Sequence, residues 1–163
     1  MQSDVMYATN MVRSKALHTK HVYISGCKIQ CFADVFFLHY GENNEKSITV
    51  LLVQDIFNKF CYSTTIPEKT VSVPSLSKAW MKLLRAGLPH FSLVRVDRDV
   101  VMAKLRDTIF KPRMMLLQPH RSKNYLSTLD ATVKTFEKKL SQYFLRRPSA
   151  NQDKALKKVS RVL

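Results

Sequence analysis

The sequence predicts an α/β domain built on a mixed five-stranded sheet, with helices on its faces and the element order β-β-β-α-β-α-β-α-α. Three observations support this prediction. Apolar strand-like runs follow one another through short turn-like links up to residue 66. Beyond that point, helical patterns alternate with two further strand-like runs. Finally, two of the apolar runs carry an aspartate, Asp34 and Asp97, where a buried strand would otherwise have an apolar side chain.

Composition indicates one globular domain with a basic surface. The chain has 163 residues, 45% of them hydrophobic and 10% aromatic, which is enough to bury a core. Residues 1–20 are polar and basic and are interpreted as an arm, whereas residues 21–163 form the domain. The net charge of +15 favours DNA or RNA as a partner, although acidic proteins or acidic lipids would respond to the same field.

The cysteine count and the hydropathy pattern restrict the class of protein further. Three cysteines form no disulfide framework, so a reducing compartment is expected. Zinc ligation by the two histidines of His18–His21 with Cys27 and Cys31 is disfavoured, because both cysteines fall inside a predicted strand. No apolar stretch is long enough to cross a bilayer and no signal peptide opens the chain, so we expect no membrane partner.

The first three strands are predicted as an antiparallel meander. Strand one spans Val22–Leu38, and the turn-forming sequence Gly41–Lys46 leads into strand two at Ile48–Val53. Strand three follows almost at once, over about Phe57–Ile66. Such short links join neighbouring antiparallel strands.

The next helix is predicted from its cap and its apolar stripe. Ser75 is the expected N-cap and Gly87 the expected residue after the C-cap. Strand four then runs from His90 to Asp97. Trp80 is interpreted as core packing rather than ligand stacking. The stripe consists of Leu76, Ala79, Trp80, Leu83 and Leu84.

Three more helices and a strand complete the predicted order. Asp99 is expected to cap a short helix, and Met114–Leu117 is expected to form strand five. After a polar loop, Thr128 is predicted to cap a long helix, and a last basic helix is predicted to begin near Ser149. The stripe of the long helix consists of Leu129, Val133, Phe136, Leu140 and Phe144.

Asp34 and Asp97 are the candidate functional pair. A carboxylate in a central strand costs several kcal/mol if nothing compensates it. Two carboxylates converging from neighbouring strands would form a divalent-metal site. The alternative is that each aspartate only caps a loop at a strand end. Acids on strands one and four of this element order indicate the ribonuclease H-like plan.

Several segments resemble the catalytic core of retroviral-type integrases, most closely the integrases of Maverick or Polinton transposons. The resemblance covers about Val12–Leu163. KIQCFADVFFL resembles the family strand with the first catalytic Asp, here Asp34. The strand after Gly87-Leu88-Pro89 resembles the one with the second, here Asp97. The family helix that carries the third acid is matched at Asp130, Thr135, Leu140, Tyr143 and Phe144.

The resemblance implies a metal-dependent strand-transfer site, which this sequence alters. Asp34, Asp97 and Asp130 would hold Mg²⁺ or Mn²⁺. Asp130 stands where the family has Glu, Val133 replaces an Asn, and Asp99 replaces the Gly of an Asp-x-Gly-x-Glu-Phe motif. We therefore expect a domesticated, catalytically inactive integrase-like domain. The alternative is an active Mg²⁺-dependent integrase or nuclease with three aspartates.

Basic residues near the third acid are the candidate nucleic-acid contacts. Lys134 and Lys138 lie one and two turns after Asp130 on one helix face, which could equally be a solvated face. Partners implied are DNA or RNA, a second copy of the chain in a homodimer, or another nuclear protein docking on the domain, with nuclear localisation. A pure protein–protein scaffold is a third possibility. The loop before the helix contributes His120, Arg121 and Lys123.

Overall fold

The computed structural model describes residues 29–41, 45–67, 70–97, 100–119 and 123–160, so the predicted N-terminal arm lies outside the described residues. The elements follow the predicted order. The strands are β1 Gln30–Tyr40, β2 Lys46–Asp55, β3 Cys61–Ile66, β4 Leu93–Val96 and β5 Leu116–Pro119. The α-helices are α2 Val73–Arg85, α3 Val100–Leu105, α4 Lys123–Arg146 and α5 Gln152–Ser160.

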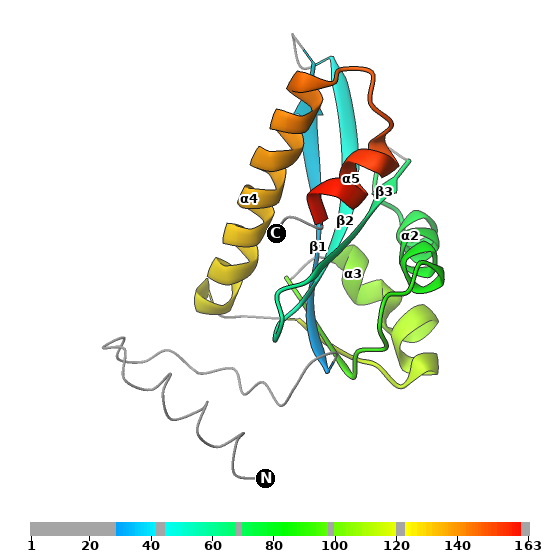
Figure 1. Cartoon of the computed structure of the whole chain (residues 1–163). Helices are drawn as coiled ribbons and strands as arrows, with labels where there is room; N and C mark the ends of the chain where they lie inside the picture. The colour runs from blue at the N-terminus through cyan, green and yellow to red at the C-terminus, as the bar shows by residue number, and fades with distance from the viewer. Residues whose placement is uncertain (1–28, 42–44, 68–69, 98–99, 120–122, 161–163) are drawn as a thin grey trace, which may run out of the picture.

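The strands form one mixed sheet with helices on both faces. Its order is β3-β2-β1-β4-β5, with β1, β2 and β3 antiparallel and with β4 and β5 parallel to β1. Cys31 and Ala33 of β1 pack on the core beneath α2 and α3, whereas Phe32 and Phe36 pack on the core beneath α4 and α5. Figure 1 shows α4 alongside β1, with α2 and α3 grouped together. This topology is the predicted ribonuclease H-like plan.

The link between β2 and β3 is a turn, where strand three was predicted to have begun. Phe57 lies in that turn, and β3 starts only at Cys61. The buried Asp55 carboxylate accepts N–H bonds from Phe57 at 2.9 Å and from Asn58 at 3.4 Å. Lys59 takes a left-handed conformation, with φ 64°. Local side chain-to-backbone bonding therefore ends the strand early.

Helix α2 begins earlier than predicted, because Ser72 rather than Ser75 is its N-cap. The Ser72 hydroxyl accepts from the Ser75 N–H, and the Ser75 hydroxyl accepts from the Ser72 N–H, which makes a capping box. Gly87, with φ 97°, follows the C-cap as predicted. Trp80 is fully buried and contacts Phe110 edge-on at 4.8 Å between ring centroids, which confirms its packing role.

The segment after α3 is more irregular than predicted. The helix continues as a π-helix over Arg106–Phe110 and a 3₁₀ turn over Lys111–Arg113. Met114 then takes a left-handed conformation with φ 56°. Strand β5 therefore starts at Leu116, two residues later than expected. A left-handed residue cannot continue a strand, so Met114 sets this boundary.

Helix α4 is longer than predicted, because it begins at Lys123 and Thr128 lies inside it. The predicted apolar stripe is buried throughout. Two ring contacts fix its alignment with β1: Phe136 meets Phe36 with ring centroids 5.9 Å apart, and Phe144 stacks on Tyr40 at 4.1 Å. Because later residues of α4 meet later residues of β1, the two elements run in the same direction.

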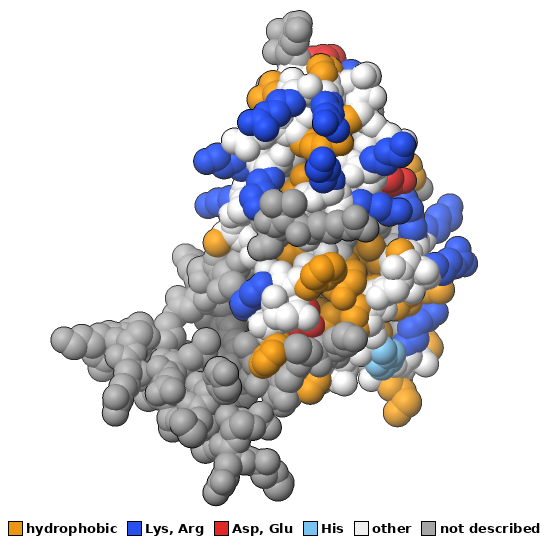
Figure 2. All heavy atoms as spheres, in the orientation of Figure 1, with side chains coloured by type: hydrophobic (Ala, Val, Ile, Leu, Met, Phe, Trp, Pro, Cys, Tyr) orange, Lys and Arg blue, Asp and Glu red, His pale blue; other side chains and the backbone are white. Residues whose placement is uncertain are grey.

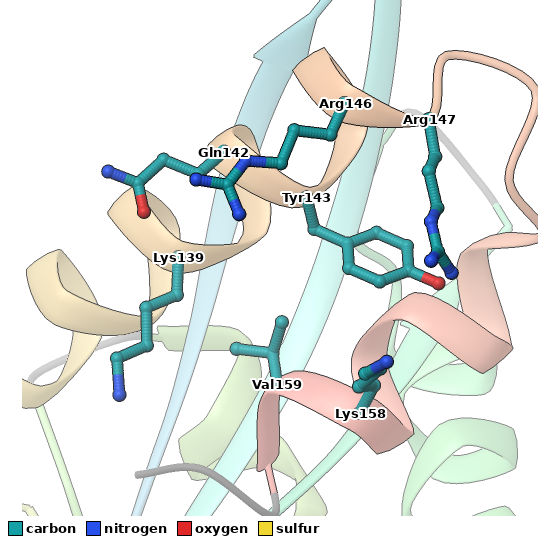
Figure 3. Close-up of a pocket in the computed structure, with 7 residues that line it drawn as sticks. All are labelled: Lys139, Gln142, Tyr143, Arg146, Arg147, Lys158 and Val159. Atoms are coloured by element: carbon teal, nitrogen blue, oxygen red, sulfur yellow. The ribbon is translucent and has the colours of Figure 1, made fainter.

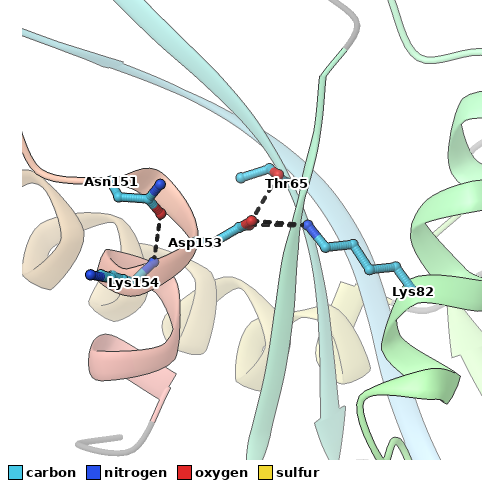
Figure 4. Close-up of polar contacts among 5 residues, drawn as sticks. All are labelled: Thr65, Lys82, Asn151, Asp153 and Lys154. Carbon is cyan, nitrogen blue, oxygen red and sulfur yellow. Dashed lines mark hydrogen bonds and ion pairs between the residues drawn. The ribbon is translucent and has the colours of Figure 1, made fainter.

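Helix α5 begins at Gln152 rather than near Ser149. The Asn151 side chain accepts the Lys154 N–H at 3.2 Å and acts as the cap. Across β3, Asp153 accepts from Lys82 of α2 and from Thr65 (Figure 4). The start of α5 is thus attached to the edge strand.

Two further expectations are tested by the described residues. No described helix is long and apolar enough to cross a membrane. Cys31 and Cys61 are free and buried. They pack in different cores, on opposite faces of the sheet. Cys31 is part of the core rather than a surface ligand, and the other residues of the zinc hypothesis lie outside the described part of the chain.

Candidate functional site

Strand pairing brings Asp34 and Asp97 together. Ala33 of β1 and Val96 of β4 are paired partners, and both pack in the core beneath α2 and α3. Asp34 directly follows Ala33, and Asp97 directly follows Val96. Because successive side chains of a strand alternate between its two faces, both aspartates point to the opposite face of the sheet. That face is the one covered by α4, because Phe32 packs there. The predicted convergence of two carboxylates is therefore supported by the strand register.

The surroundings of Asp34 leave its carboxylate partly exposed. Its partner across β2 is Leu52, which is fully buried. Asp34 itself is only half-buried, and its Oδ1 accepts the N–H of Val35 at 2.8 Å. Asp97, just beyond β4, is exposed. The pair thus lies at the border of the core, where it is reached by solvent and by solutes.

Arg95 is a neighbour that sequence reasoning missed. It pairs with Phe32 in the β1–β4 register, two residues before Asp97 and on the same face. Its Nε and Nη2 both donate to the side-chain oxygen of Gln30 at 3.2 Å. A guanidinium on this face offsets part of the repulsion between two carboxylates. The sequence does contain this signal, because Arg95 and Asp97 are two residues apart and alternate residues of a strand lie on the same face.

A hydrogen bond shows which flank of α4 faces β2 and hence on which flank Asp130 lies. Thr132 Oγ1 donates to Gln54 Oε1 of β2 at 3.1 Å. At about 100° per residue, Asp130 lies on nearly the opposite flank of the helix from Thr132. Since β4 lies on the other side of β1 from β2, this flank is the one nearer the aspartate pair. Asp130 is exposed on it.

The three predicted acids do not assemble into a complete ligand set. Among the described residues, no three His, Cys, Asp or Glu side chains gather closely enough to hold a metal ion. Asp34 and Asp97 offer carboxylate oxygens, which suit Mg²⁺ or Mn²⁺, whereas Asp130 is exposed on α4 and forms no three-acid group with them. When bound, such an ion would polarise a phosphodiester. Two of the three predicted ligands are therefore neighbours, and no reaction step is assigned.

The predicted nucleic-acid contacts are divided between described and undescribed positions. Lys134 and Lys138 are exposed, and helical spacing places them on the Asp130 flank of α4. Lys123 lies in the first turn of α4 rather than in a loop. His120 and Arg121 lie outside the described residues.

Basic side chains extend beyond the predicted contacts. Figure 2 shows Lys and Arg side chains spread over α4, α5 and the link between them, with few acidic side chains on that face. Lys139, Arg146 and Arg147 belong to this surface and were not predicted. Glu137 lies on α4 among these cations, and burial raises the pKa of its carboxyl, partly offset by Lys134.

Comparisons with known proteins identify the fold. No family profile matches the chain, and no curated protein matches it. The catalytic core of HTLV-2 integrase, solved with magnesium in a dimeric form, shares 13% identity over 82% of this chain and 84% of that one, with a TM-score of 0.65. The catalytic core of BIV integrase shares 10% identity over 82% and 81%, with a TM-score of 0.61.

A larger assembly gives the same result. The simian T-cell lymphotropic virus intasome, solved with the PP2A regulatory subunit B56 gamma, shares 16% identity with a TM-score of 0.66. That match covers 95% of this chain and 59% of the viral chain. At these identities the likeness concerns the fold alone. The chain has the ribonuclease H-like fold of a retroviral integrase catalytic core.

Proposed function

We propose that this domain is a domesticated integrase-like module that binds DNA or RNA and does not carry out strand transfer. The observation that carries the proposal is the flank of α4 on which Lys134 and Lys138 are exposed beside Asp130, next to the Asp34–Asp97 pair. A net charge of +15 would draw a polyanion to this surface. Charge and fold together favour nucleic acid over a neutral ligand.

The altered motif supports the absence of catalysis. Asp130 is one methylene shorter than the Glu of the integrase motif, which withdraws the carboxylate by about 1 Å, and misplacement of that size costs about 10²-fold in rate. Val133 is buried in the core under α4, so it offers no polar group where the family has Asn. These changes fit descent from a Maverick- or Polinton-type integrase whose strand-transfer activity is no longer used.

Assembly and location complete the proposal. A homodimer, or docking of another nuclear protein, fits a nuclear integrase-like module. The HTLV-2 core was solved in dimeric and trimeric forms, and the simian viral intasome was solved in complex with the PP2A regulatory subunit B56 gamma. These relatives make association with a second protein a reasonable expectation for this fold.

The test measures the salt dependence of binding to a DNA duplex and an RNA strand. Lys134→Gln with Lys138→Gln should lower the slope of log affinity against log salt by about two, because each lost phosphate contact removes about 0.9. Lys78→Gln with Lys104→Gln, both exposed on the α2–α3 side, is the matched control and should leave the slope unchanged. If the chain binds only acidic proteins, the scaffold reading replaces the proposal.

The second candidate is an active Mg²⁺-dependent integrase or nuclease. The pairing of Asp34 with Asp97 favours it, because these would be the ligands of a shared ion. Calorimetric titration of Mg²⁺ and Mn²⁺ tests it, with Asp34→Asn and Asp130→Ala as variants. Binding that vanishes in both variants, together with nicking or strand transfer, would establish the active enzyme. Absence of binding at millimolar metal would support the inactive module.

A further inference from the structure

A basic groove lies between the C-terminal half of α4 and α5, on the flank of α4 away from Asp130. Its volume is about 320 Å³. Figure 3 shows Tyr143 projecting from α4 toward α5, with Val159 of α5 beneath and Arg147 beside the tyrosine ring. The groove is lined by Lys139, Gln142, Tyr143, Arg146, Arg147, Lys158 and Val159.

The groove gathers cations, and none of the described residues that line it is acidic. Arg146 is the last residue of α4 and Arg147 follows it, and the helix dipole favours a positive charge at this end. The helix dipole does not account for Lys139, which lies within α4, or for Lys158, which belongs to α5. Basic side chains from α4, from the residue after it and from α5 thus meet at one groove, and their field attracts a polyanion.

Two groups in the groove are held in place for binding. The Arg147 guanidinium lies over the Tyr143 ring, 5.6 Å from its centroid. The backbone N–H of Arg147 donates to the Tyr143 and Phe144 carbonyls at 3.1 and 3.2 Å. A fixed guanidinium has a fork of donors that matches phosphate oxygens. The half-buried Tyr143 forms an aromatic wall beside it.

A ridge along α4 joins this groove to the acidic site. Lys134, Lys138, Gln142 and Arg146 follow one another at intervals of four residues, and all are exposed. Residues at that interval are neighbours on a helix surface, and each step turns about 40° around the axis, so the ridge winds from the Asp130 flank to the groove. The ridge is about 18 Å long at 1.5 Å per residue, which corresponds to about five base pairs of duplex at 3.4 Å each.

We propose that the α4–α5 groove is a second phosphate-binding site, which holds the nucleic-acid backbone further along α4 from the Asp34–Asp97 pair. The inference rests on the proposed function and extends it. A continuous row of evenly spaced polar and basic side chains fits the repeating phosphates of a nucleic acid better than the irregular carboxylates of an acidic peptide. The peptide is therefore an outcome of the test rather than a second proposal.

The experiment compares three variant sets by anisotropy titration over a salt series, with a duplex of about 20 base pairs and an RNA strand of similar length. The groove variant carries Lys139→Gln, Arg146→Gln and Lys158→Gln, which leaves the Arg147–Tyr143 contact intact. The ridge variant carries Lys134→Gln and Lys138→Gln. The control variant also removes three positive charges, but at exposed residues elsewhere: Lys78→Gln, Lys104→Gln and Lys111→Gln.

The groove variant should lower the salt slope by about three and weaken binding at least about tenfold near 0.1 M salt, while its unfolding midpoint stays close to that of the parent. The control should have little effect. The proposal is overturned if the groove variant binds like the control, or if it loses only the binding of a poly-glutamate probe. A groove variant that binds normally, alongside a weakened ridge variant, leaves the proposed function standing. No binding by the parent chain overturns both.

Discussion

The Thr132 hydroxyl donates to the side-chain oxygen of Gln54 at 3.1 Å, and this bond ties α4 to the central part of the sheet. Gln54 is almost fully buried, and its amide nitrogen donates to the carbonyl of Lys59 at 3.3 Å in the β2–β3 turn. One buried amide therefore connects the turn, β2 and α4. The bond holds the Thr132 flank of α4 against β2, and Asp130 lies on the opposite flank.

Thr132→Val should lower the free energy of unfolding by about 1–2 kcal/mol, because Gln54 Oε1 would be left buried without this donor. Urea denaturation measures the change. Thr135→Val is the matched control, since Thr135 is exposed and its hydroxyl donates to the Ala131 carbonyl of the same helix at 2.7 Å. Its effect should stay within about 0.5 kcal/mol. Equal losses in both variants would contradict the anchoring role.

Patterns of local origin predicted most of the fold. The apolar runs identified the strands in their order, and the stripe from Leu129 to Phe144 identified the buried face of α4. Element boundaries were less predictable, because competing local bonds decide them. Ser72 and Ser75 are both good caps, and only the structure shows that Ser75 serves as the third residue of the helix.

The site was predictable in part for the same reason. Asp34 and Asp97 could be found because each interrupts or closes an apolar run, and the register of β1 with β4 brings them side by side. Arg95 and the groove residues depend on which elements become neighbours in space. Lys139 and Lys158 are 19 positions apart and meet only because α5 folds back on α4. A helical pattern cannot reveal that contact.

Asp55 is predicted to be structural. Its buried carboxylate accepts the N–H groups of Phe57 and Asn58 and so closes the β2–β3 turn. Asp55→Ala should cost about 2–3 kcal/mol of unfolding free energy, because two turn donors lose their acceptor. Asp55→Asn keeps one acceptor oxygen and should cost less. Thermal and urea unfolding of the two variants give the comparison, and an alanine variant as stable as the parent would rule out this role.

Cys61 should make stability depend on alkaline pH. Burial raises the pKa of its thiol from 9.0 to about 11, partly offset by a hydrogen bond with Gln54. The unfolded thiol ionises first as pH rises, so stability present below pH 9 is lost between about pH 9 and 11. The loss should be about 1–2 kcal/mol.

The difference between the parent chain and Cys61→Ala isolates this contribution, because other groups titrate in the same range. Burial also raises the pKa of Tyr62, for example, and that effect is shared by both chains. Urea unfolding at pH 8.5 and near pH 11 measures it. Parallel pH profiles for the two chains would contradict the assignment to Cys61.

Asp34→Asn should leave the fold intact and raise the free energy of unfolding by up to about 1 kcal/mol. The side-chain oxygen of Asn can still accept the Val35 N–H, while one charge of the Asp34–Asp97 pair is removed. Asp97→Asn should act in the same direction. Urea denaturation near neutral pH measures both. A loss above about 2 kcal/mol would show that the Asp34 charge itself stabilises the domain.

Asp130→Glu should strengthen binding of Mg²⁺ or Mn²⁺. The added methylene extends the carboxylate by about 1 Å from the flank of α4 nearer the Asp34–Asp97 pair, and divalent ions bind more tightly as carboxylate ligands are added. Calorimetric titration of the parent, Asp130→Glu and the exposed control Asp107→Glu measures the gain. Adding Asp34→Asn to Asp130→Glu should remove this gain in affinity, because the ion would then lose the carboxylate that β1 supplies. An affinity unchanged by Asp130→Glu would mean that α4 lies too far from the sheet to supply a third ligand.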